Sequence, residues 1–275
     1  MPFFSSLLTR AATLIIVLIC ILGLSKPSFA NVHGLRCLVE AYPQTLSSQT
    51  DIQSNILIWR DGTRMSYDDG VTPRSFEELL EEADLKDQMS MPYPMGKLST
   101  PPAFNADPGR VRHEAFFEKM YGESESEVRH QLTRVYWSPA ETYVSFSQTN
   151  GAANALALVG QKISAQPDLA AYVRQTVGTF NWRNIHGTNR KSNHSFGIAI
   201  DFKLPNPLYK YWQWSGCRVG TVCPYPSAVL RDTILQRIVT IFEMHGFIWG
   251  GKWHHYDVMH FEYRPELTHP LCSSH

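Results

Sequence analysis

Three residues of types that bind transition metals occur in two short stretches of the C-terminal half of the chain. His194 lies seven residues before Asp201, and His260 follows after a further long segment. Imidazole nitrogens and carboxylate oxygens bind Zn²⁺ at about 2.0–2.2 Å. Three protein ligands leave the fourth position of the ion open for water, as in catalytic rather than structural sites. These residues therefore predict one catalytic Zn²⁺ per chain.

Asp257 precedes His260 by three residues and is the candidate general base. Two strand residues three positions apart face opposite sides of a sheet, so this role needs a bend or a bulge between them. With that bend, the Asp257 carboxylate can reach the water at the open metal position, whose pKa the metal lowers. The alternative is that Asp257 orients a ligand histidine. His254 and His255 are expected to be exposed or to support the ligands.

The order of these residues resembles the VanY-like D-alanyl-D-alanine carboxypeptidase family, which also contains L-alanyl-D-glutamate endopeptidases. The resemblance covers about residues 135–266 and implies that His194, Asp201 and His260 bind zinc and that Asp257 is the base, where many members carry Glu. It also implies an α+β fold of the Hedgehog/DD-peptidase type, in which a small antiparallel sheet flanked by helices carries the zinc. The matching positions are Ser192, His194, Gly197, Ala199 and Asp201, followed by Asp257 and His260.

The family often has an arginine before the first ligand that steadies the substrate or the developing oxyanion. Arg183 and Arg190 are the two candidates in this chain, and neither lies in the family's common Tyr-Arg-Ser setting. We favour Arg183 as the catalytic arginine, because Trp182 could hold it rigid and a guanidinium fork suits a carboxylate. Arg190 and Trp253 are then expected to bind substrate.

The first thirty residues have the pattern of a secretory signal peptide. Arg10 precedes an apolar run over residues 11–24, which is followed by the small-residue pattern Ser28-Phe29-Ala30. The run is shorter than the about 20 residues that span a bilayer. We predict cleavage after Ala30 and a periplasmic or secreted protein with no membrane attachment, the alternative being an uncleaved anchor.

Four cysteines remain after this cleavage, and an even number in an exported chain suggests two disulfides. Four cysteines allow three pairings. We favour a short clasp, Cys217–Cys223, together with a bond between the two ends of the mature chain, Cys37–Cys272.

Local signals predict the elements that position these residues. We divide the chain into a signal peptide (1–30), an N-terminal extension (31–109) and a zinc peptidase domain (110–275). The extension is expected to hold a hairpin around an Asp-Gly turn at 61–62, a helix from the Ser75/Glu78 capping box to about Leu85, and a Pro-rich wrap over 91–109. In the domain, we predict helices over 110–121 and 124–132, from an Asn150 cap, from Pro167 to near Gly178 and from Ser227 to Gly246, with strands at 143–146 and 197–202.

An open metal site in an exported chain favours hydrolysis of peptidoglycan stem peptides, and D-alanyl-D-alanine carboxypeptidase is the preferred activity. The alternatives are an L-alanyl-D-glutamate-type endopeptidase and a non-catalytic zinc-containing module that binds the cell wall. Asp257 favours an enzyme, because a binding module need not keep a base beside the metal. The 25 basic and 25 acidic residues balance, which gives no electrostatic case for a nucleic acid or an anionic membrane as partner.

Overall fold

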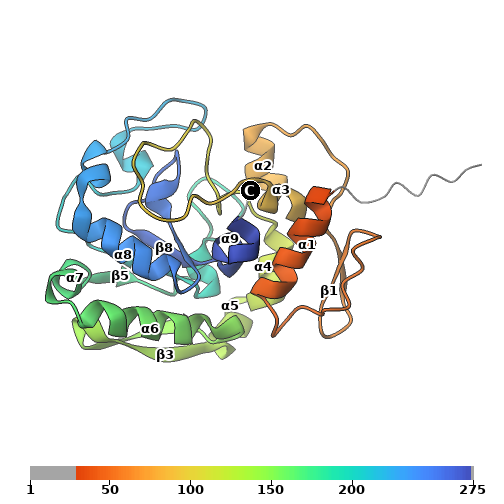
Figure 1. Cartoon of the computed structure of the whole chain (residues 1–275), viewed down its shortest axis with the longest axis horizontal. Helices are drawn as coiled ribbons and strands as arrows, with labels where there is room; N and C mark the ends of the chain where they lie inside the picture. Colours follow the sequence, from red (N-terminus) through yellow and green to blue (C-terminus); the bar gives the residue numbers. More distant parts are fainter. Residues whose placement is uncertain (1–28, 274–275) are drawn as a thin grey trace, which may run out of the picture.

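The computed structural model describes residues 29–273, and a four-stranded antiparallel sheet in the order β5-β6-β8-β7 lies at its centre (Figure 1). In the two central strands, Asp201 is directly opposite His260. Helix α8 (Thr233–Glu243) packs on this sheet, where the ring of Phe242 stacks on that of Phe261 with centroids 4.1 Å apart. The strands are β5 (Thr176–Gly178), β6 (Ala199–Phe202), β7 (Phe247–Trp249) and β8 (His260–Tyr263).

A second layer consists of helix α6 (Ala152–Ser164) and an antiparallel hairpin of β3 (Leu132–Trp137) and β4 (Thr142–Ser147). Figure 1 shows α6 lying along β3. Trp137 joins this layer to the central sheet, with its ring centroid 5.3 Å from that of Phe202. A Cβ at Gly160 would lie 3.2 Å from the Trp137 ring, so the glycine allows the helix to approach the hairpin closely.

The N-terminal extension packs into the same hydrophobic core as the rest of the chain. Tyr42 and Trp59 both contact Phe116, with ring centroids 5.7 and 5.4 Å apart, and Phe117 contacts Phe196 next to the first predicted ligand. The hydrophobic core therefore extends without interruption from the N-terminal extension to the turn that carries His194. Its elements are α1 (Phe29–Ala41), β1 (Ile56–Ile58), β2 (Arg64–Ser66), α2 (Phe76–Glu82) and α3 (Leu85–Ser90).

The structure confirms an α+β architecture and several local predictions. β1 and β2 form the predicted antiparallel hairpin, and Gly62 in its turn has a φ of 86°. The capping box of Ser75 and Glu78 opens α2 with both reciprocal hydrogen bonds. In each case the signal lies within a few residues of the element, which is why the sequence was sufficient.

Several predicted helix boundaries are wrong. The helix expected from residue 110 begins only with α4 (Glu114–Tyr121), and the next, α5 (Glu125–His130), ends early because Leu132 starts β3. Asn150 does not cap α6, since its φ is 53° and Gly151 holds the cap position. The remaining two corrections are that α7 (Pro167–Tyr172) gives way to β5, and that Ser227–Arg231 is a 3₁₀ turn before α8.

One of the two predicted disulfides is present. Cys37 on α1 is bonded to Cys272 on α10 (Pro270–Ser273), and this bond joins the two ends of the described chain. The Cys217–Cys223 prediction is wrong, since both are free thiols in the described part of the chain. The predicted signal peptide lies outside the described residues except for its last two. Across residues 29–273, we find no helix with the length and apolarity to span a membrane.

Loss of the Cys37–Cys272 bond is expected to lower the free energy of unfolding by about 3–5 kcal/mol, because it closes a loop of 235 residues. Chemical denaturation of the oxidised protein and of a Cys37→Ser/Cys272→Ser variant measures this difference. The matched control is a Cys217→Ser/Cys223→Ser variant, which should keep the wild-type response to a reducing agent. Equal stability of the oxidised protein and the Cys37/Cys272 variant would contradict the expectation.

Candidate metal centre

His194, Asp201 and His260 converge at the centre of the sheet. His194 lies in a 3₁₀ turn that precedes β6, Asp201 is on β6, and His260 begins β8. Nε2 of His194 is 3.1 Å from Oδ2 of Asp201, and Nδ1 of His260 is 2.9 Å from Oδ1 of the same carboxylate. One ligand atom from each residue lies within 4.8 Å of the other two. The structure thus brings the three predicted ligands together around one point.

The outer nitrogen of each histidine ring is held by a hydrogen-bond acceptor. Nδ1 of His194 is 2.8 Å from the carbonyl oxygen of Thr179, and Nε2 of His260 is 2.9 Å from Oε2 of Glu262. Acceptors at these positions select the tautomer in which the inner nitrogen carries a lone pair, which is the arrangement found around metal-binding histidines. The two rings therefore present Nε2 of His194 and Nδ1 of His260 toward Asp201.

An unsatisfied atom supports a metal at this point. Nε2 of His194 is buried and makes no hydrogen bond within the described part of the chain, although Oδ2 of Asp201 is only 3.1 Å away. The two atoms are close enough for an ion pair, but they do not form a hydrogen bond. A buried polar atom without a partner is costly. Two ligand atoms that face a common cation would have this geometry, so the residues present fit Zn²⁺.

The turn that carries His194 depends on its neighbours. Ser192 caps the turn, with its Oγ accepting a hydrogen bond from the His194 N–H at 3.4 Å. Gly197 ends it with a φ of 66°, and a Cβ there would lie 2.4 Å from Cδ2 of Leu132. Ser195 is fully buried and donates to the carbonyl of Arg183 at 2.7 Å. These contacts fix the backbone from which His194 reaches the sheet.

Asp257 reaches the same site because the chain bends before β8. The backbone N–H of His260 donates to the Asp257 carbonyl at 3.2 Å, which closes a turn over residues 257–260. Asp257 lines a cavity of about 560 Å³ together with the three ligands, and its buried Oδ1 has no hydrogen-bond partner among residues 29–273. Burial raises the pKa of the Asp257 carboxyl to about 6, although the charge of His260 opposes this. Such a carboxylate is suited to accept a proton near neutral pH.

The three predicted substrate residues all line the cavity. Arg183 is exposed, and its guanidinium bonds only weakly to the Asn184 carbonyl at 3.4 Å. Arg190 is instead buried, with Nε 3.2 Å from a carboxylate oxygen of Glu81, and burial lowers its pKa from the ordinary value. Trp253 is buried with its ring centroid 5.6 Å from that of His260. Of the two arginines, Arg183 is therefore the freer to meet a ligand.

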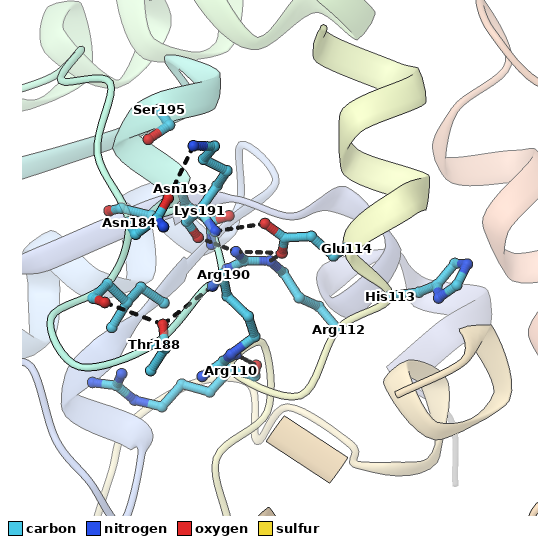
Figure 2. A network of polar contacts seen from close by, with 12 residues as sticks. Arg110, Arg112, His113, Glu114, Asn184, Thr188, Arg190, Lys191, Asn193 and Ser195 are labelled. Carbon is cyan, nitrogen blue, oxygen red and sulfur yellow. Dashed lines mark hydrogen bonds and ion pairs between the residues drawn. The ribbon is translucent and has the colours of Figure 1, made fainter. Parts of the chain in front are cut away.

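We call residues 107–112 the strap, and three of them, Gly109, Arg110 and Arg112, line the cavity. Figure 2 shows Arg110 and Arg112 next to Arg190 and Lys191. A Cβ at Gly109, whose φ is 100°, would lie 2.4 Å from Ile248, so the strap approaches the sheet closely. Hydrogen bonds join five strap residues to the stretches around His194 and His260. Their partners are the His255 N–H for Asp107, the Trp253 Nε1–H for Pro108, Arg264 for Gly109, Arg190 for Arg110, and the Lys191 carbonyl for Arg112.

Arg110 on the strap was not among the candidates from the sequence. Its Nε and one terminal nitrogen donate to the His255 carbonyl at 3.1 and 2.9 Å, and its guanidinium lies 4.4 Å from the centroid of the Trp253 ring. Within residues 29–273 no carboxylate is within ion-pair distance of it. Arg110 thus places a fixed positive charge on the cavity wall, and its distance in sequence from the motifs gave no signal for this role.

Glu262 is a second residue that was missed. Its carboxylate accepts hydrogen bonds from His260, Asn193 and Arg264. Burial alone would raise the pKa of Glu262, but the His260 hydrogen bond and the Arg264 charge lower it to about 2. The sequence did hold a signal, because residues two apart on a strand point to the same face. His254 and His255 are both buried, and His255 holds the strap through Asp107.

Residues 186–263 match the family model described as D-alanyl-D-alanine carboxypeptidase. Comparisons with curated proteins and with solved structures gave no match. The matched segment contains His194, Asp201, Asp257 and His260, whereas the strap and the N-terminal extension lie outside it. Over residues 186–263, the chain is therefore similar to the D-alanyl-D-alanine carboxypeptidase family of peptidases that its motifs resemble.

Proposed function

We propose that the protein is a zinc-dependent peptidase of the Hedgehog/DD-peptidase fold type that hydrolyses peptidoglycan stem peptides outside the cytoplasm. The preferred activity is that of a D-alanyl-D-alanine carboxypeptidase. The observation that carries the proposal is the convergence of His194, Asp201 and His260, each histidine with its outer nitrogen fixed, beside the buried carboxyl of Asp257. The disulfide between Cys37 and Cys272 supports an oxidising compartment.

The residues of the site have distinct roles in this reaction. His194, Asp201 and His260 would hold Zn²⁺, which would supply a Lewis acid for the scissile carbonyl and for the attacking water. Asp257 accepts the proton of the attacking water and delivers it to the amine that leaves. The Thr179 carbonyl and Glu262 keep the two imidazole rings oriented, and the cavity walls hold the peptide against the base.

Two guanidinium groups that have no carboxylate partner within the described residues favour a carboxypeptidase over an endopeptidase. A carboxypeptidase must bind the free carboxylate at the end of its substrate, which requires a cation near the metal. Arg183 and Arg110 both line the cavity, and neither forms an ion pair with a carboxylate in the part of the chain that the structure describes. Arg183 was our choice from the sequence, and the structure adds Arg110, whose stacking on Trp253 leaves it less freedom.

A pair of substrates that differ only at the C-terminus separates these two arginines. Wild-type enzyme should prefer a peptide with a free carboxylate to its C-terminal amide. If an arginine binds this carboxylate, its replacement by glutamine should lower kcat/KM for the acid by about 10–100-fold, the value of one charged hydrogen bond, and spare the amide. The variants are Arg110→Gln and Arg183→Gln, with Arg129→Gln, an exposed arginine paired to Glu125, as the control. Equal losses on acid and amide would argue against a carboxylate clamp.

The function itself is tested by incubating the purified protein with muropeptides and analysing the products by mass spectrometry. We expect release of the terminal D-alanine, loss of this activity with a chelator, and its recovery when Zn²⁺ is added back. Cleavage between L-alanine and D-glutamate would instead identify an endopeptidase. No turnover of any cell-wall peptide by the zinc-loaded protein would overturn the enzyme proposal and favour a binding module.

A further inference from the structure

Charged side chains alternate along the segment that starts at the ligand His260. Glu262 is on the same face of β8, and Arg264 and Glu266 continue the two-residue spacing into α9 (Pro265–Thr268). Oε1 of Glu262 accepts from Arg264 at 3.0 Å, and Nε of Arg264 donates to Oε1 of Glu266 at 2.6 Å. The exposed fractions of Glu262, Arg264 and Glu266 are 2%, 0% and 0%. The metal ligand is therefore the first member of a buried chain of charges.

The other end of this chain lies in the N-terminal extension. The Tyr42 hydroxyl, directly after α1, donates to Oε2 of Glu266, and Nε2 of Gln88 on α3 lies 3.1 Å from Oε1. Figure 1 shows α1 and α9 side by side, and the Cys37–Cys272 disulfide joins the segments on either side of this contact. Glu266 thus has both carboxylate oxygens held by groups of the extension.

Stability alone is a weak explanation for these buried charges. Buried ion pairs lose so much hydration that apolar residues of similar volume are often equally stabilising, whereas charge networks fix geometry. Of the groups at the two ends of this row of buried charges, only His260 has a chemical role that depends on its geometry. Glu262 also accepts a hydrogen bond from Asn193, the residue next to His194, so it contacts the surroundings of both histidine ligands. Oε2 of Glu262 holds Nε2 of His260, and Oε1 is held by Arg264, so the His260 ring has little freedom to rotate.

We propose that Glu262, Arg264, Glu266 and Tyr42 are positioning residues through which the N-terminal extension orients His260 and raises the affinity of the site for zinc. The inference rests on the proposed function only in that His260 binds the metal. The carboxylate of Glu262 holds the imidazole N–H and increases the electron density on the opposite nitrogen. Arg264 fixes Glu262, Glu266 fixes Arg264, and Tyr42 and Gln88 fix Glu266. The extension is thereby a part of the metal centre although it contributes no ligand.

The protein contains a second buried network that can serve as a matched control for this one. Glu243 and Lys252 form a second buried ion pair, and the hydroxyl of Tyr93 donates to the Glu243 carboxylate at 2.7 Å. This network also joins the N-terminal extension to the zinc-carrying part of the chain, and like Glu266, Arg264 and Tyr42 it consists of a glutamate, a cation and a tyrosine. Within residues 29–273, none of the hydrogen bonds of Tyr93, Glu243 and Lys252 reaches His194, Asp201 or His260. It reports what the loss of a comparable buried hydrogen bond does to the fold alone.

The test measures the zinc Kd of the full mature chain by competition with a chromophoric chelator, alongside the unfolding free energy of the metal-free protein. Glu262→Gln should weaken zinc binding by about 10–100-fold, and Tyr42→Phe and Glu266→Gln by roughly 3–10-fold because they act through Arg264. Tyr93→Phe and Glu243→Gln should change stability by similar amounts and keep the zinc Kd within about twofold. The visible spectrum of the Co²⁺-substituted protein should change in the first group of variants only.

Two results would overturn the inference. One is an unchanged zinc Kd in Tyr42→Phe and Glu266→Gln, and the other is an equal loss of affinity in the Tyr93 and Glu243 controls. Tyr42→Phe removes one hydroxyl group, so it keeps the test valid if Glu266→Gln does not fold. Failure of the proposed function would look different. In that case the wild-type chain itself would bind no zinc, and there would be no metal centre for these residues to position.

Discussion

Replacing Asp257 with asparagine is expected to lower kcat by about 10²–10⁴-fold, the usual contribution of a general base. The amide cannot take a proton from water, yet it has almost the same shape as the carboxyl group. Asp257 is not one of the three ligands, so the variant should bind zinc as tightly as the wild type. Steady-state kinetics on a muropeptide, with the zinc content measured in the same sample, tests both parts of this expectation.

Asp257→Glu is the matched variant, since many members of the family that this chain resembles carry Glu at the corresponding position. It keeps the carboxylate one methylene further from the backbone, and we expect it to keep more activity than Asp257→Asn. If Asp257→Asn kept more than a tenth of the wild-type kcat, Asp257 would not be the base. A loss of zinc in Asp257→Asn would show instead that Asp257 supports the ligands.

Removal of a single ligand is expected to have the second large effect. His260→Ala or Asp201→Ala should weaken zinc binding on the order of 10³-fold, because one of three ligands carries about a third of a binding free energy of 10 kcal/mol or more. The turnover rate at stoichiometric zinc should fall together with the affinity for zinc. Equilibrium dialysis followed by elemental analysis measures the affinity, and the metal-free variants should remain folded by circular dichroism.

His245→Ala is the control for these ligand variants. His245 follows α8, and its Nδ1 lies 2.8 Å from the Ile241 carbonyl, so it belongs to the end of that helix and not to the cavity. The zinc Kd of His245→Ala should equal that of the wild type. Full zinc binding by His260→Ala would contradict the proposed ligand set.

The metal site was more predictable from the sequence than the surfaces around it. The ligands and the base are set by residue type and spacing, and the bend before His260 followed from strand geometry. Glu262 could have been found by the same alternation of side chains along β8. Arg110 could not, since it lies far from the motifs and only the contacts of the strap bring it to the cavity.

The wrong predictions of helix boundaries also come from contacts between residues that are far apart in sequence. Residues 110–113 are compatible with a helix, but the hydrogen bonds of Arg110 and Arg112 to distant loops hold them outside α4. Leu132 was assigned to a helix, whereas its pairing with Ser147 begins a hairpin. Such contacts join residues that are far apart in sequence, and local propensity is a weak guide where they decide the structure.

X-ray absorption at the zinc edge tests most directly whether two histidines and one carboxylate hold the metal. One equivalent of Zn²⁺ bound to the wild-type chain should show only nitrogen and oxygen neighbours at about 2.0–2.2 Å, with the outer-shell pattern of two imidazole rings. The free thiols of Cys217 and Cys223 are the competing soft ligands in the described chain. A sulfur neighbour at about 2.3 Å, or the absence of imidazole scattering, would contradict the site formed by His194, Asp201 and His260.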